Sequence, residues 1–431
     1  MKLWNKEGIT TSAIIESFTV GKDKDFDLRL AKYDVLGTMA HTKMLSEVGL
    51  LSKADYAAIE TELSSILKMI ESNEFLIDLD EEDVHSQIEK MLTEKLGEVG
   101  KKIHSGRSRN DQVLTDIKLF LKDELKLLST EVKVLFNQLI ALSEKHKNDL
   151  LPGYTHFQMA MPSSFGMWFG AWAESLVDDM ELVQAAYNVC DKNPLGSGAG
   201  YGSSFPLNRT MTTELLHFST MNVNPVYAQM TRGKTEKVVS YGISSIASTL
   251  SRFSYDVCLY MNQQFGFISF PDELTTGSSL MPHKKNPDVF ELIRAKCNRI
   301  QAIPNELTIL TNNLPSGYHR DMQLTKEILF PALEQMHECL HMMHFMLEHI
   351  QIKKEILSDH KFNLLFTVEK VNELVSRGVP FREAYKLVGE EVAKGKFTYS
   401  GNLTHTHEGS IGNLCNDRIV AAMDRFKKLT K

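Results

Sequence analysis

A stretch of 39 residues without glycine or proline, from Asp111 to Asp149, most restricts how this chain can fold. Apolar residues recur along it at spacings of three and four, which places them on one face of an α-helix. At about 1.5 Å per residue, this helix would be roughly 58 Å long. The residues of its apolar face are Val113, Leu114, Ile117, Leu121, Leu125, Leu128, Val132, Leu135, Leu139 and Leu142. A helix of this length with one apolar face predicts a bundle, because the face has to pack against other helices.

Four further stretches share the pattern, so the sequence predicts five long helices in a central bundle. These stretches are residues 163–191, 234–264, 288–312 and 321–350. Pro304 lacks a backbone N–H, and we expect it to kink the fourth stretch rather than end the helix. Gly/Pro-rich connections are predicted to be loops at the bundle ends, where a rigid scaffold can position catalytic groups. They cover residues 151–162, 193–209, 266–287 and 313–320.

The predicted fold class is all-α, with the central bundle flanked by two smaller, mainly helical domains. A length of 431 residues suggests about three domains. We expect an N-terminal helical domain at 1–107, the long-helix bundle at 108–356 and a small helical domain at 357–431. Within the last of these, residues 398–413 are predicted to hold a short hairpin or an ordered loop.

Charge and composition exclude several classes of protein. Lys and Arg number 48 against 55 Asp and Glu, a net charge of −7, which offers no basic field for nucleic acid. No run of 18 apolar residues and no signal-peptide pattern at the start are found, so neither a membrane span nor secretion is expected. Five dispersed cysteines without a C-x-x-C pair favour a reducing cytoplasm over a metal site.

The loop at residues 275–287, TTGSSLMPHKKNP, is the most informative stretch for chemistry. Gly277 beside Ser278 allows backbone conformations that expose amide donors, while Lys284 and Asn286 add side-chain donors. Together these groups suit an anion, and a helix starting after Pro287 would add its positive dipole end. A solvated basic turn is the open alternative.

Two other stretches carry candidate binding and catalytic groups. Residues 104–112, HSGRSRNDQ, place two arginines before the longest helix, and arginine's planar fork matches carboxylates. The alternative there is a capped helix start with solvated arginines. Residues 152–158, PGYTHFQ, put His156 in a turn, where it is a candidate acid or base unless its role is structural.

These motifs resemble a known family. The loop at 277–286 resembles the G-S-S-x-M-P-x-K-x-N signature of the fumarase/aspartase superfamily, whose members release fumarate from succinyl compounds by anti β-elimination. Residues 104–112, 152–158, 194–199 and 284–288 resemble, in this order, the argininosuccinate lyase family within it. The similarity extends from about Trp4 to 377–384 and implies cleavage of argininosuccinate to arginine and fumarate, the last step of arginine synthesis.

The resemblance also implies a role for each matching residue. Ser278 is implied to be the base, on a mobile loop that closes over substrate, and Lys284 and Asn286 to bind the substrate carboxylates. Thr155 and His156 fall on the family's Thr-His pair, with His156 close to Glu291 and delivering a proton to the leaving nitrogen. Substrate-binding roles are implied for Arg107, Ser108, Arg109, Asn110, Tyr318, Gln323 and Lys326.

A cofactor-free and metal-free homotetramer is implied as well, with each active site built from three subunits. The chemistry agrees, because proton removal beside a carboxylate creates negative charge that Lys284 can stabilise. A serine base is credible only where closure excludes water and donors stabilise its alkoxide. The chain departs from the family at Trp4–Gly8, at Tyr385 where His is common, and in a short C-terminal region.

Three alternatives remain open from the sequence. Another fumarate-releasing lyase of the superfamily, similar to adenylosuccinate lyase, shares the loop but not the S-R-N-D-Q stretch. His337, Glu338 and His341 satisfy H-E-x-x-H, the pattern of a zinc metallopeptidase, although no third ligand is marked. A structural role, as in lens proteins related to the family, is the third, and retention of Ser278 and Lys284 argues against it.

Overall fold

The computed structural model describes residues 13–78, 80–401, 403 and 405–429, and it divides into two compact units. Unit 1 comprises Met1–Leu127, Leu182–Ser244 and Ile300–Gln335, and unit 2 comprises Leu128–Glu181, Ser245–Arg299 and Met336–Lys431. Each unit is therefore assembled from three separate segments of the chain. The predicted division into three domains stays a prediction.

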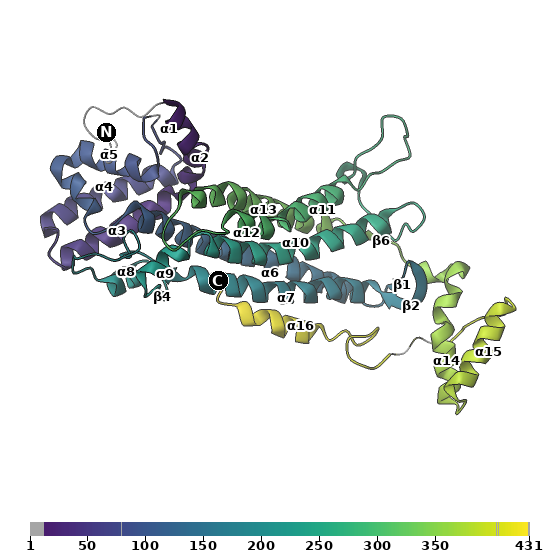
Figure 1. The fold of residues 1–431 in the computed structure, drawn as a ribbon. Helices are drawn as coiled ribbons and strands as arrows, with labels where there is room; N and C mark the ends of the chain where they lie inside the picture. Colours follow the sequence, from purple (N-terminus) through teal and green to yellow (C-terminus); the bar gives the residue numbers. More distant parts are fainter. Residues whose placement is uncertain (1–12, 79, 402, 404, 430–431) are drawn as a thin grey trace. The chain divides into compact units, whose positions relative to one another are not determined.

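Unit 1 is almost entirely helical (Figure 1). It contains α1 (Ala13–Val20), α2 (Asp23–Asp27), α3 (Ala31–Glu47), α4 (Lys53–Glu71), α5 (Val84–Leu96), α8 (Arg209–Leu215), α9 (Pro225–Met230) and α12 (Ile303–Leu310). It also holds the first parts of α6 (Arg109–Lys145), α10 (Lys234–Met261) and α13 (Thr325–Glu348), the end of α7 (Phe165–Cys190), and the parallel pair β3 (Lys192–Asn193) and β4 (Thr220–Met221).

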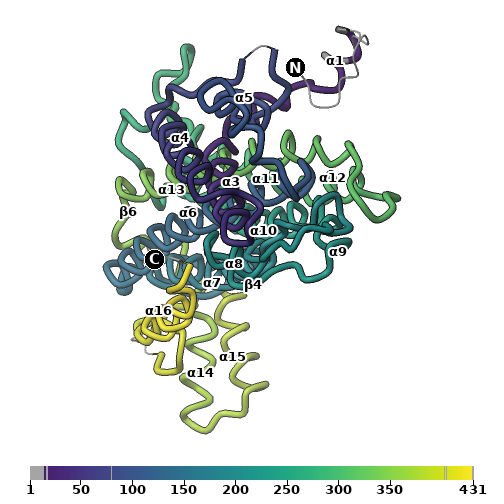
Figure 2. Tube along the Cα trace, turned by 90° about the vertical axis from the view of Figure 1, so that its left-hand side faces the viewer, coloured from purple at the N-terminus to yellow at the C-terminus, as the bar shows by residue number. Residues whose placement is uncertain are grey.

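The helices α3, α4 and α5, labelled in Figures 1 and 2, contribute to an apolar core in unit 1. This core contains Val35, Met44, Leu45, Ile59, Leu63, Ile66, Ile88 and Leu92, all at most 1% exposed. The starts of two of these helices are capped by side chains, as helix N-termini require. Ser52 Oγ accepts from Asp55 N at 3.1 Å for α4, and Asp83 Oδ1 accepts from Ser86 N at 2.7 Å for α5.

Unit 2 combines long helix segments with short strand pairs and a small helical hairpin. It contains the remaining parts of α6, α7, α10 and α13 with β1 (Leu150–Thr155), β2 (Gln158–Ser164), β5 (Ile268–Ser269), α11 (Asp288–Ile300), β6 (Gln351–Ile352), α14 (Thr367–Ser376), α15 (Phe381–Ala393) and α16 (Asn416–Met423). Both β1–β2 and β5–β6 are antiparallel.

Aromatic side chains fasten α7 to α10 in unit 2. The Trp168 ring lies 5.3 Å from Phe253, centroid to centroid, and its indole N–H donates to Asp256 at 3.1 Å. The α14–α15 hairpin, drawn in yellow-green in Figure 1, has a small core of its own, made of Val371, Ala384, Val388 and Phe397. No described helix combines the length and the apolar character that crossing a bilayer demands.

The all-α prediction is confirmed, and two of its details need correction. The predicted loop at 151–162 is the β1–β2 hairpin, in which Leu150 pairs with Ser164 and Thr155 with Gln158. The predicted single helix at 288–312 is two helices, α11 and α12. Pro304 stands in the first turn of α12, where its missing N–H costs nothing, so it starts a helix instead of kinking one.

Candidate active site

Helix α6 begins within the arginine-rich stretch that the sequence singled out. Ser108 N donates to Asp111 Oδ1 at 2.8 Å and Asn110 N donates to Ser108 Oγ at 3.2 Å, which caps the first turn. The other Asp111 oxygen accepts from Gly196 N at 2.9 Å and Gly198 N at 2.8 Å. One buried carboxylate therefore fixes both the start of α6 and the glycine-rich loop 194–200.

The two arginines of this stretch have different surroundings. Arg107 is buried, and its guanidinium donates to Thr38 Oγ1 at 2.9 Å. Arg109 lies partly open and donates to Asp83 Oδ2 at 2.5 Å and to Ser86 Oγ at 2.9 Å. Arg107 is thus bound within the fold, whereas Arg109 faces a cavity.

That cavity, in unit 1, has a volume of about 240 Å³ and brings together five of the predicted substrate-binding residues. They are Arg109, Asn110, Tyr318, Gln323 and Lys326. Its remaining lining residues were not predicted from the sequence: Val20, Asp23, Asp27, Glu82, Asp83, His85, Val113, Arg232 and Arg320. The predicted residues Arg107 and Ser108 are not part of this lining, although they directly precede Arg109 in the chain.

Charges of both signs meet inside this unit 1 cavity. Lys326 Nζ lies 2.5 Å from Asp27 Oδ1 and 2.6 Å from Asp23 Oδ1. Burial lowers the pKa of Lys326, but the two carboxylates outweigh it and the pKa is raised. Burial and the neighbouring Asp27 raise the pKa of Asp23 to about 6, against the opposing effect of Lys326. The cavity can therefore hold a ligand that carries both a cation and an anion.

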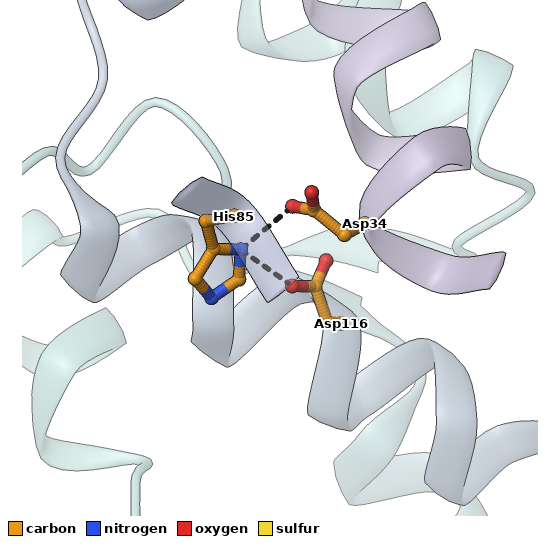
Figure 3. Close-up of side chains that lie close together, drawn as sticks. All are labelled: Asp34, His85 and Asp116. Atoms are coloured by element: carbon orange, nitrogen blue, oxygen red, sulfur yellow. Dashed lines mark hydrogen bonds and ion pairs between the residues drawn. The ribbon is translucent and has the colours of Figure 1, made fainter. Parts of the chain in front are cut away.

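His85 lines the unit 1 cavity. Its ring nitrogen faces two buried carboxylates, those of Asp34 and Asp116 (Figure 3). Its Nδ1 lies 2.9 Å from Asp34 Oδ1 and 3.7 Å from Asp116 Oδ2. Burial lowers the pKa of His85, but Asp34, Asp83 and Asp116 together outweigh this effect and the pKa rises to about 9. The ligand atoms of these three residues lie within 4.8 Å of one another, as a metal site would need. A protonated His85 neutralises part of the charge of Asp34 and Asp116, so we interpret the group as an ion pair.

The sequence contains few patterns that predict the other residues lining the unit 1 cavity. Glu82, Asp83 and His85 belong to an acidic run, and such runs are usually solvated. The spacing of Asp23 and Asp27 is the usable signal, because residues four apart share one face of a helix. The structure shows that both face the same lysine.

In unit 2, Thr155 and His156 lie at the tip of the β1–β2 hairpin, and both are exposed. His156 has φ of 54° and Phe157 has φ of 58°, both left-handed, as a two-residue type I′ turn requires. This conformation is energetically unfavourable for residues other than glycine, and such strain is concentrated at functional sites. Within the described part of the chain, no hydrogen bond joins His156 to Glu291.

Ser278 lies in the signature loop, defined as residues 275–287. Its Oγ accepts from the backbone N–H groups of Leu280 at 3.3 Å and Met281 at 3.1 Å. Asn286 closes the loop, since its backbone N donates to Thr276 O at 2.8 Å and its side-chain amide to Gly277 O at 3.3 Å. The Ser278 oxygen therefore already faces donors that would stabilise a negative charge on it.

Three predicted residues, Lys284, Asn286 and Glu291, line a second cavity of about 580 Å³ in unit 2. Lys284 and Glu291 are exposed, whereas Asn286 is half-buried. The structure thus brings eight of the predicted residues together in two cavities, one in each unit, whereas Thr155, His156 and Ser278 line neither cavity.

The H-E-x-x-H residues of α13 serve contacts between helices instead. His337 Nδ1 lies 2.6 Å from Glu131 Oε2, and Glu338 Oε2 lies 2.5 Å from Lys296 Nζ. Among the described residues, these side chains belong to no group with the geometry of a metal site. The metallopeptidase alternative has no support in this arrangement.

Comparisons with known proteins show the family to which the chain is similar. The model of the Lyase family matches residues 6–302. An argininosuccinate lyase of Bacteroides thetaiotaomicron is 55% identical over 424 residues, covering 98% of this chain and 95% of that protein. One from Phocaeicola vulgatus is 57% identical over 422 residues, covering 98% and 94%, and one from Thermotoga neapolitana is 40% identical over 395 residues, covering 92% and 99%.

Solved structures show the same fold at lower identity. An EDDS lyase in complex with formate superposes with a TM-score of 0.75 at 21% identity, covering 98% of this chain and 91% of that one. A class II fumarase from Schistosoma mansoni gives 0.74 at 16% identity, covering 96% and 93%. With a family model that matches most of the chain and close relatives along nearly all of it, this chain belongs to the Lyase family and, within it, to the argininosuccinate lyases.

Proposed function

We propose that this chain cleaves L-argininosuccinate to L-arginine and fumarate by anti β-elimination. The observation that carries the proposal is the identity of 55–57% to argininosuccinate lyases along 98% of the chain. The unit 1 cavity supports it, because its cationic and anionic side chains suit an amino acid. The residues that match the family's motifs also support the catalytic and binding roles that the resemblance implies for them.

In this proposal Ser278 is the base. It takes the proton from the succinyl carbon next to the one that bears nitrogen, and the electrons of that C–H bond form the double bond of fumarate. The C–N bond breaks, and the leaving guanidino nitrogen receives a proton from His156. The amides of Leu280 and Met281 support this role, since they stabilise an alkoxide on Ser278.

Lys284 and Asn286 bind the carboxylate beside the reacting carbon, where negative charge grows in the transition state. Thr155 and Glu291 act with His156 in proton delivery. Arg109, with Asn110, Tyr318, Gln323 and Lys326, binds the arginine end of the substrate. Ser108 caps the start of α6, which carries Arg109 and Asn110, and Arg107 is bound to Thr38 of α3.

We further propose a homotetramer in which three copies contribute to each active site. The exposed positions of His156 and Lys284 support this, because proton transfer and charge stabilisation need a site from which water is excluded. Neighbouring copies would supply that cover. A cytoplasmic location and independence of metals and cofactors remain predictions from the sequence.

A substrate panel tests the proposed reaction. The purified chain is offered argininosuccinate, adenylosuccinate, aspartate and malate, and fumarate release is followed by ultraviolet absorbance. Turnover of argininosuccinate alone is expected. Turnover of adenylosuccinate in its place would refute the proposal, and a folded tetramer without turnover of any of the four would favour a structural role.

A further inference from the structure

The cations that line the unit 1 cavity differ in how many carboxylates they face. Three arginines each have an acidic partner: Arg109 with Asp83 at 2.5 Å, Arg320 with Glu82 at 3.1 Å and Arg232 with Glu236 at 2.9 Å. Lys326 instead faces two carboxylates, Asp23 and Asp27. This trio carries a net negative charge in a largely buried place, where an unbalanced charge is costly.

Of the two carboxylates, Asp23 is the one open to a ligand. Both carboxylates line the cavity, but the Asp27 side chain is only 3% exposed, whereas the Asp23 side chain keeps 17% of its surface exposed. The pKa of Asp23 is raised to about 6 by burial and by Asp27, which reflects the same imbalance. A cation bound beside Asp23 would correct it.

We propose that Asp23 binds the α-ammonium group of the arginine moiety and so selects an intact amino acid. This inference rests on the proposed function. Asp23 Oδ1 and Lys326 Nζ lie 2.6 Å apart and present opposite charges side by side. An amino acid carries an ammonium and a carboxylate on one carbon, so the two charges of the site complement those of the ligand.

The geometry favours an ammonium over a guanidinium at this position. A guanidinium is best matched by both oxygens of one carboxylate. In Asp23, Oδ1 already lies beside Lys326, which leaves one oxygen, and a single oxygen suits the compact ammonium. A ligand without the ammonium would leave this carboxylate uncompensated, and a site of that kind rejects such analogues strongly.

The test compares two substrates in the reverse reaction with fumarate. One is arginine and the other is 5-guanidinopentanoate, which is arginine without its α-amino group. The parent is expected to prefer arginine, and Asp23→Asn to lower the ratio of the two kcat/KM values by about 10- to 100-fold, as loss of a charged hydrogen bond predicts. The change should lie in KM for arginine, with kcat little altered.

Asp25→Asn is the matched control, because Asp25 is an exposed residue on the same helix α2 and does not line the cavity. It should keep the parental ratio. If Asp23→Asn folds and also keeps that ratio, the inference is wrong while the proposed function stands. If the parent does not turn over argininosuccinate at all, the proposed function fails, and the inference fails with it.

A second measurement needs no variant. Protonation of Asp23 removes its attraction for the ammonium, so KM of the parent for arginine should rise as pH falls through about 6. KM for 5-guanidinopentanoate should not rise in this way, because that substrate has no α-ammonium group for Asp23 to attract. Equal rises for both substrates would overturn the inference even if Asp23→Asn cannot be purified.

Discussion

At the scale of single residues, Ser278 is the side chain whose loss should separate binding from turnover. Ser278→Ala removes one oxygen and should lower kcat by about 10²- to 10⁴-fold, the usual contribution of a positioned acid or base. Substrate binding should survive, because Lys284 and Asn286 remain. The control is Ser279→Ala, the neighbouring serine of the same loop, which should keep most of the activity.

Exchange of the substrate's β-hydrogen with deuterated solvent identifies the base directly. The exchange should vanish in Ser278→Ala and persist in His156→Asn, if His156 only protonates the leaving nitrogen. A Ser278→Ala enzyme that exchanges at the parental rate would exclude Ser278 and leave His156 as the leading candidate.

His85 should make the stability of the fold depend on pH. Burial lowers its pKa, yet Asp34, Asp83 and Asp116 together outweigh burial and raise the pKa from 6.5 to about 9. The imidazolium therefore stabilises the folded state fully below pH 6.5, and this contribution is lost as pH rises through 9. The parent should lose about 3 kcal/mol of unfolding free energy over this window relative to His85→Asn.

Urea denaturation at several pH values measures this difference. His360→Asn, at an exposed position in unit 2, should follow the parent curve. If the unfolding free energies of the parent and of His85→Asn depended on pH in the same way, the imidazole would be neutral. The cluster in Figure 3 would then again qualify as a metal site.

At the scale of elements, the sequence predicts helices well where one face is apolar and glycine and proline are absent. Helix α6 satisfies both conditions, and its predicted and observed bounds differ by a few residues. The β1–β2 hairpin was missed because its turn uses His156 and Phe157 at positive φ, without the glycine or asparagine that marks such turns. Pro304 was placed in the correct helical stretch, but its pattern fits a helix start as well as a kink.

The candidate site was predicted only in part, for a related reason. Motif residues such as Asn110 and Lys326 are recognisable as a set, and the structure places them around one cavity. Asp23 and His85 were missed because charged side chains are ordinarily solvated, and only the fold brings them together in a buried place. Periodicity does not mark a buried ion pair.

Asp111 connects two elements and should be costly to replace. Its carboxylate accepts hydrogen bonds from the backbone N–H groups of Ser108, Gly196 and Gly198. In Asp111→Asn, the side-chain NH₂ group would face at least one of these donors. A buried donor without an acceptor costs about 1–3 kcal/mol, so the unfolding free energy should fall by that amount. Chemical denaturation measures it, with Asp178→Asn on the exposed face of α7 as control. A loss no larger than that of the control would show that the loop does not depend on this carboxylate.

At the scale of the whole molecule, the proposed chemistry needs more than one copy of the chain. Thr155, His156 and Lys284 are exposed in the single chain, where water would compete for every proton and charge that they handle. A closed symmetric assembly covers such groups on all copies at once. Light scattering should therefore find a tetramer, and an active monomer would refute the shared site.

Mixing two inactive variants tests whether residues of one active site come from different copies. Ser278→Ala lacks the proposed base, and Asn110→Ala lacks a group of the unit 1 cavity. When the two are unfolded together and refolded as mixed tetramers, about a quarter of the sites should combine an intact Ser278 from one copy with an intact Asn110 from another. The mixture should then recover about a quarter of the parental activity, measured as fumarate release, while each variant refolded alone recovers none. If both residues of a site came from the same copy, no combination of the two variants could restore it, and mixed tetramers as inactive as either variant would contradict the proposed assembly.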